Sequence, residues 1–171
     1  MTISEIFLPE FEQELTNTRK LLERLPDGNF DYKPHPKSMT LGNLAWHIAQ
    51  LPGWAKPTVD LDTLVIPPDF KPESPTSKQQ ILDEFEKAAA QGKEAIAGAT
   101  DEHLMKDWTL KFGDHVVFTQ KRHSVLRNVV INHLIHHRAQ LGVYLRLNEI
   151  EIPGMYGPSA DEMKFWKAEQ S

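Results

Sequence analysis

The sequence contains no cysteine among its 171 residues. This absence excludes disulfide bonds, zinc sites built on cysteine and a nucleophilic thiol supplied by the protein itself. A cytoplasmic protein, which needs no disulfide bonds, is the simplest account of such a composition.

Long apolar runs and clusters of basic residues are also missing. No apolar run approaches about 18 residues, so we expect no transmembrane helix. Acidic residues interrupt the apolar part of the N-terminal stretch MTISEIFLPEFEQELTNTRK, which argues against a signal peptide. Lys and Arg are scattered, and the formal net charge is −5. We therefore do not expect nucleic acid to be the main partner.

The residues that are present suit an ordinary globular protein, with 40% hydrophobic and 25% charged side chains. One domain over residues 1–171 is expected from this length. Apolar residues at helical spacing, bounded by Pro and Gly, predict helices near residues 4–25, 40–56, 77–99 and 122–147.

The connections between these helices differ in character. Residues 57–76 contain several prolines and are expected to form a long surface connection. Residues 101–120 contain two β-prone stretches around Gly113 and predict a short hairpin or a pair of extended segments. Ser159 and Glu162 form a capping box, which predicts a short final helix.

The last long helix carries the most informative pair of residues. His133 and His137 replace apolar residues on its predicted inward face, and their spacing places both imidazoles on one side of the helix. Such a pair can bind one metal ion, but with eight histidines in the chain a chance pair of packed imidazoles is an equal alternative. His47, at the edge of the apolar stripe of residues 40–56, is the candidate third ligand.

Four other histidines are expected to have no ligand role. His35 lies between two prolines, and His103 and His115 lie in a polar connection, so loop and surface positions are predicted for all three. His136 neighbours the pair but points about 100° away from it, so a partly exposed position or one behind a ligand is predicted.

Four segments, taken in their order and spacing, resemble the DinB/YfiT-like superfamily. They are SMTLGNLAWH, NHLIHHRAQ, YLR and IPGMYGPS, at residues 38–47, 132–140, 144–146 and 152–159. The resemblance extends from about residue 5 to 165. It implies an all-α fold, which we predict as an up-down-down-up four-helix bundle with a short extended segment or hairpin before the last helix. It also implies a divalent metal, zinc or nickel, bound by His47, His133 and His137.

Two more residues match the histidine-rich string of this superfamily. Arg138 and Gln140 flank the predicted site, where either one could orient a ligand or anchor an anionic substrate. Gln140 could equally be a packing residue.

The resemblance also suggests chemistry, because characterised relatives include S-transferases and an isomerase that use low-molecular-weight thiols. Three histidines leave a coordination position open, which is typical of a catalytic metal. We therefore expect a metal-dependent transferase that activates a low-molecular-weight thiol for attack on a small electrophilic substrate. The alternatives are a hydrolase using metal-bound hydroxide and a non-catalytic metal-binding module. The resemblance further implies a homodimer, for which Trp54, Trp108 and Trp166 are possible exposed contacts.

Overall fold

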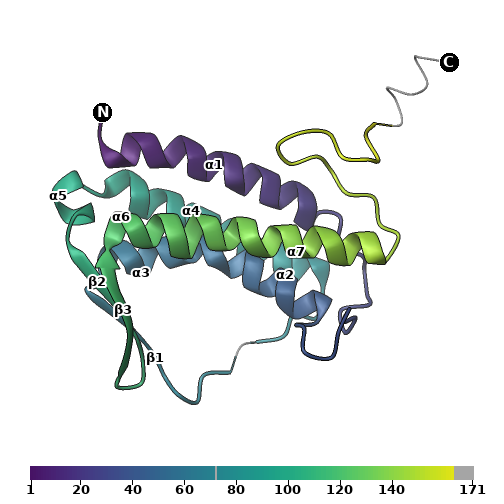
Figure 1. Cartoon of the computed structure of the whole chain (residues 1–171), viewed down its shortest axis with the longest axis horizontal. Helices are drawn as coiled ribbons and strands as arrows, with labels where there is room; N and C mark the ends of the chain where they lie inside the picture. Colours follow the sequence, from purple (N-terminus) through teal and green to yellow (C-terminus); the bar gives the residue numbers. More distant parts are fainter. Residues whose placement is uncertain (72, 164–171) are drawn as a thin grey trace.

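The computed structural model describes residues 1–71 and 73–163. In Figure 1 the long helices lie side by side along the longest axis, with a small sheet at the end that holds the N-terminus. At the opposite end of the molecule, residues 148–163 form a loop that turns back from the end of the last helix. The elements are α1 (Ile3–Leu22), α2 (Leu41–Gln50), η1 (Leu51–Trp54), α3 (Ala55–Asp60), β1 (Thr63–Ile66), α4 (Lys78–Gly98), α5 (Asp101–Leu104), β2 (Asp107–Phe112), β3 (His115–Lys121), α6 (Arg122–Val125), η2 (Leu126–Asn132) and α7 (His133–Leu147).

The prediction of an all-α four-helix bundle is wrong, because the described residues include a mixed three-stranded sheet. β1 pairs with β2 in parallel, and β2 pairs with β3 in antiparallel. The hairpin between β2 and β3 lies in the predicted region and turns at Gly113, whose φ is +56°. β1 was not predicted: its four residues lie in the proline-rich connection, and such a short strand is stable only through its pairing with β2.

Two buried side chains attach this sheet to the helices. Arg122 donates hydrogen bonds to the backbone carbonyls of Asp107 and Leu61 and to the carboxylate of Asp62. Trp108 is completely buried, and its indole N–H donates to the carbonyl of Pro57 at 3.0 Å. The expectation that Trp108 is an exposed dimer contact is therefore wrong.

The helix that carries His47 is longer and less regular than predicted. Thr40 caps α2 by accepting a hydrogen bond from the backbone N–H of Asn43. Pro52 has no N–H to donate to the α-helical ladder, and a 3-10 turn replaces one turn of helix at that point. The chain then continues into α3 and reaches Asp60, four residues beyond the predicted end at residue 56.

The last helix spans the predicted bounds, residues 122–147, but it is not α-helical throughout. Seven residues from Leu126 to Asn132 have π-helical hydrogen bonds, and the regular α-helix begins at His133. Single-turn π segments are rare and are often found at functional sites. The first and third helices, α1 and α4, lie within three residues of their predicted bounds.

One core joins these helices. Phe11 and Leu22 of α1, Leu44 and Ile48 of α2, and Phe85 of α4 are buried together with the inward face of α7. The packing of α2 against α7 brings His47 to the two histidines of α7. Within residues 1–71 and 73–163, no helix is long and apolar enough to cross a membrane.

Candidate metal centre

The three predicted histidines meet between α2 and α7. The Nε2 atoms of His133 and His137 are 2.9 Å apart, and the Nε2 atoms of His47 and His133 are 3.4 Å apart. One ligand atom from each residue can be chosen so that all three lie within 4.8 Å of one another. Tyr144 helps to align the two helices, because its hydroxyl donates to the carbonyl of Met39 just before α2 begins.

The two separations that involve His133 suit ligands of a single metal ion. Two nitrogen ligands at about 2.1 Å from one ion are about 3.0 Å apart at a right angle and about 3.4 Å apart at the tetrahedral angle. The separations of 2.9 Å and 3.4 Å are close to these values. Three imidazole nitrogens on one side of an ion leave at least one position for a further ligand.

The surroundings of the cluster favour neutral imidazoles. Burial, followed by the charges of His137 and His133, lowers the pKa of His47 to about 4. Burial is also the largest cause that lowers the pKa values of His133 and His137. A neutral imidazole has a lone pair available for a metal, so protons compete little for these nitrogens at neutral pH.

Both histidines of α7 make a further hydrogen bond. The Nδ1 atom of His137 is 2.7 Å from Oε1 of Gln140, one helical turn away. The ring of His133 makes a hydrogen bond with the backbone of Val129. Contacts of this kind orient imidazole rings at metal sites.

Comparisons with known proteins identify the family of this chain. The model of the DinB family matches residues 2–170. The chain belongs to the DinB family. It is 31% identical over 156 residues to the uncharacterized protein YrdA of Bacillus subtilis (strain 168). The matched residues cover 91% of this chain and 89% of that protein.

Two solved structures are similar to the DinB-family fold of this chain. A DinB-like protein from Bacillus cereus ATCC 10987 is 29% identical with a TM-score of 0.66, covering 89% of this chain and 97% of that one. The DinB-like protein YjoA from Bacillus subtilis is 19% identical with a TM-score of 0.65, covering 86% and 95%, and it supports the fold alone.

The other residues predicted near the site lie in different surroundings. His136 is exposed, with its ring centroid 4.9 Å from that of His137. Arg138 is only 2% exposed and forms a 2.6 Å ion pair with Glu14 of α1. It also donates to Thr18 and to the hydroxyl of Tyr156. This buried pairing favours a structural role for Arg138 over that of a substrate anchor.

Glu14 is the residue of this network that the sequence analysis missed. Its carboxylate forms an ion pair with Arg138 and accepts a hydrogen bond from the hydroxyl of Tyr156, and the side chain is buried. One signal was available: Glu14 lies between Phe11 and Leu15 on the buried face of α1, where a lone carboxylate needs a partner.

The remaining histidines do not reach the cluster. His35 and His115 are exposed, as predicted. His103 is half-buried, with its Nε2 atom 2.6 Å from the carbonyl of Val59, so the prediction of a surface position is only partly right. It helps to join α5 to α3.

The two ligand candidates on α7 lie beside the buried stripe rather than on it. Leu134, Arg138 and Leu141 occupy the inward positions, whereas His133 and His137 are half-buried. The predicted stripe assumed one α-helical period from Leu126 onward, and the π-helical segment changes the residue-to-face relation before His133. The histidines therefore have access to solvent, which a core position would deny them.

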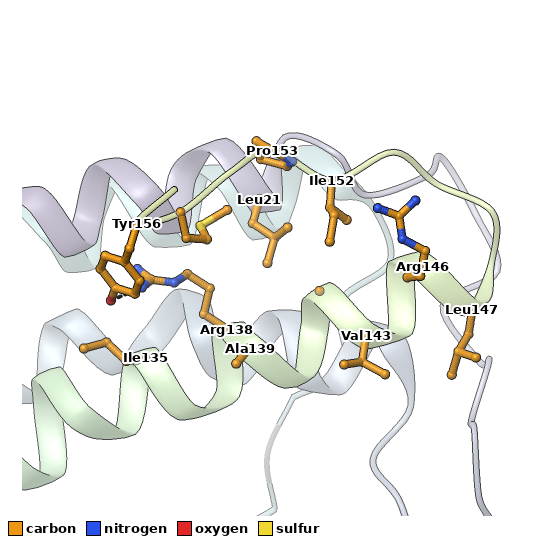
Figure 2. A pocket seen from close by; sticks show the side chains of 12 residues that line it. Leu21, Ile135, Arg138, Ala139, Val143, Arg146, Leu147, Ile152, Pro153 and Tyr156 are labelled. Atoms are coloured by element: carbon orange, nitrogen blue, oxygen red, sulfur yellow. Dashed lines mark hydrogen bonds between the residues drawn. The ribbon is translucent and has the colours of Figure 1, made fainter. Parts of the chain in front are cut away.

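An apolar cleft lies on another side of α7 (Figure 2). It has a volume of about 450 Å³, and its walls include Leu21 of α1, Ala139 and Val143 of α7, and Ile152 and Met155 of the loop. None of His47, His133 and His137 lines this cleft, and Ala139 projects about 120–160° around the helix from the two histidines of α7. The cleft is therefore separate from the metal centre.

Proposed function

We propose that this protein is a divalent-metal-dependent transferase that activates a low-molecular-weight thiol for attack on a small electrophilic substrate. The observation that carries the proposal is the convergence of three neutral imidazoles from His47, His133 and His137, with access to solvent. A structural zinc site normally has four protein ligands, whereas a site with three keeps a position for substrate.

The roles of the chain's own residues follow from this geometry. The three histidines would hold the ion without adding negative charge, so the site would keep a net charge of 2+ and act as a strong Lewis acid. When bound, a divalent metal lowers the pKa of a coordinated thiol and keeps it as a thiolate. Because the chain has no cysteine, the sulfur that reacts must come from a second small molecule.

Zinc and nickel are the proposed metals. Imidazole nitrogens bind both ions well, and a histidine-only set does not by itself select one of them. Elemental analysis of the protein as purified from its natural host is the direct measurement of which metal it holds.

The test is the consumption of an electrophile by metal-loaded protein. We expect zinc- or nickel-loaded protein to consume 1-chloro-2,4-dinitrobenzene only when a small thiol is added. His133→Ala should lower this rate by about 100-fold or more because it removes a ligand. His35→Ala, which changes an exposed histidine in the connector, is the matched control and should retain the full rate.

Two other outcomes would contradict the transferase proposal. Metal-dependent turnover of an ester without any thiol would indicate a hydrolase. Stoichiometric metal without turnover across a panel of thiols and electrophiles would indicate a non-catalytic metal-binding module.

We also propose that the protein forms a homodimer. Of the three tryptophans that the sequence offers as contacts, Trp54 is half-buried, Trp108 is buried and Trp166 lies outside the described residues. Val143, Leu147 and Tyr156, beside the apolar cleft, are large exposed side chains that a second copy can cover. Sedimentation as a monomer at high micromolar concentration would contradict this proposal.

A further inference from the structure

We infer that Gln140 is a positioning residue that fixes the tautomer of His137 and thereby presents the Nε2 lone pair to the metal. This inference rests on the proposed metal-dependent function. It assigns Gln140 a single role among those that the sequence left open, which were ligand orientation, substrate anchoring and packing.

The first step of the argument is the hydrogen bond itself. Oε1 of Gln140 lies 2.7 Å from Nδ1 of His137. A carbonyl oxygen can only accept, so His137 donates and its single proton is on Nδ1. The lone pair is then on Nε2, the atom that lies 2.9 Å from Nε2 of His133.

The opposite tautomer would place a proton on the nitrogen that has to bind the metal. If the Nδ1 atom of His137 carried no proton, the proton would be on Nε2 and would point toward His133. Metal binding would then require the ring to change tautomer first. By holding the proton on Nδ1, Gln140 removes this requirement.

The position of Gln140 suits this role better than packing. The residue is exposed, so its substitution removes little buried apolar surface. It lies three residues after His137 on α7, where helix geometry places the two side chains next to each other. His133 has the backbone of Val129 as its hydrogen-bond partner, and no substitution can delete a backbone group. Gln140 is therefore the partner that mutation can test.

Three variants separate positioning from a general structural effect. Gln140→Ala removes the acceptor, and we expect it to weaken zinc binding by about 10- to 100-fold. Gln140→Glu keeps an acceptor that cannot donate when ionised, so zinc affinity should return at least to that of the unmodified protein. Gln91→Ala makes the same change of residue type in α4 and should leave zinc affinity unchanged.

Two measurements are made on each variant. Competition with a chromophoric chelator gives the zinc affinity of the folded protein. Imidazole ¹⁵N chemical shifts of the metal-free protein show directly which nitrogen of His137 carries the proton. We expect Nδ1–H in the unmodified protein and in Gln140→Glu, and a mixture of tautomers in Gln140→Ala.

The inference fails if the unmodified protein carries the proton on Nε2, or if Gln140→Glu binds zinc as weakly as Gln140→Ala. Both measurements are made without substrate, so a protein that binds zinc as described but transfers no thiol would contradict only the proposed reaction. Unmodified protein that binds neither zinc nor nickel would contradict the proposed function, whereas the shifts of His137 would still report on its tautomer.

Discussion

At the scale of single residues, the histidines of the centre differ from ordinary surface histidines in their affinity for protons. Burial is the largest cause that lowers the pKa of each, and His47 reaches about 4. The ordinary pKa of histidine is about 6.5. We expect zinc to stay bound when the pH is lowered to this value, and to be released only at a lower pH. Zinc occupancy measured as a function of pH against a fixed competitor checks this. Release centred above about pH 6.5 would contradict it.

The same pKa values set the sign of a stability change in the metal-free protein. Because the folded-state pKa values are lowered, the unfolded chain binds more protons than the folded chain as the pH falls below about 6.5. The free energy of unfolding should therefore decrease as the pH is lowered over that range. The contribution of His47 to this decrease should level off below a pH of about 4. His47→Phe, which cannot titrate, should reduce this slope in urea unfolding measured at several pH values.

The buried pair of Glu14 and Arg138 gives a second prediction for single residues. Arg138→Met leaves the carboxylate of Glu14 buried without its cation, and we expect a loss of about 3–5 kcal/mol in the free energy of unfolding. The double variant Glu14→Leu with Arg138→Met should lose much less, because no unpaired charge remains. Urea unfolding of the two single variants and the double variant measures this coupling. Equal losses in Arg138→Met and in the double variant would contradict it.

At the scale of the elements, glycines at two positions should respond oppositely to alanine. Gly142 lies inside α7, and a Cβ there would meet nothing within 4 Å, so Gly142→Ala should stabilise the protein by about 0.5–1 kcal/mol. Gly113 has φ of +56°, and its Cβ would lie 3.0 Å from Pro68, so Gly113→Ala should destabilise it by about 1 kcal/mol or more. Thermal unfolding of both variants measures the difference, and a change of the same sign at both positions would contradict this account.

The elements also show what the sequence could and could not predict. The bounds of α1 and α4 follow closely from apolar periodicity and from caps such as Ser77 of α4. β1 has too few residues to show a period, and its pairing with β2 is a contact more than 40 residues apart in the chain. The apolar spacing of Leu126–Asn132 predicts an ordinary α-helix, so its π-helical hydrogen bonds could not be predicted from the sequence.

The candidate site could be predicted from the sequence only in part. His47, His133 and His137 could be selected because each departs from an apolar pattern at a defined helical position. The roles of their neighbours could not be read in this way. Arg138 and Gln140 are two residues apart on α7, yet one is paired with Glu14 in the core and the other contacts His137 at the surface. Only the packing of α1 against α7 distinguishes them.

At the scale of the whole molecule, the centre joins parts of the chain that are distant in sequence. His47 belongs to α2, and the other two histidines are 86 and 90 residues further along, in α7. The unfolded chain does not hold these three imidazoles together, so a metal that binds at the centre should favour the folded state. A metal in this position is therefore expected to stabilise the protein as a whole.

Removing the metal should lower the melting temperature by a predictable amount. Free zinc at about 100 times its dissociation constant contributes about 2.7 kcal/mol, which corresponds to about 5–10 °C for a chain of this length. Calorimetry with zinc and with excess chelator measures the difference. It should disappear in His47→Ala, which disconnects α2 from the ion, and it should persist in His35→Ala, which changes a histidine outside the cluster. An equal zinc-dependent shift in His47→Ala would mean that α2 contributes no ligand, and the three-histidine centre would then be wrong.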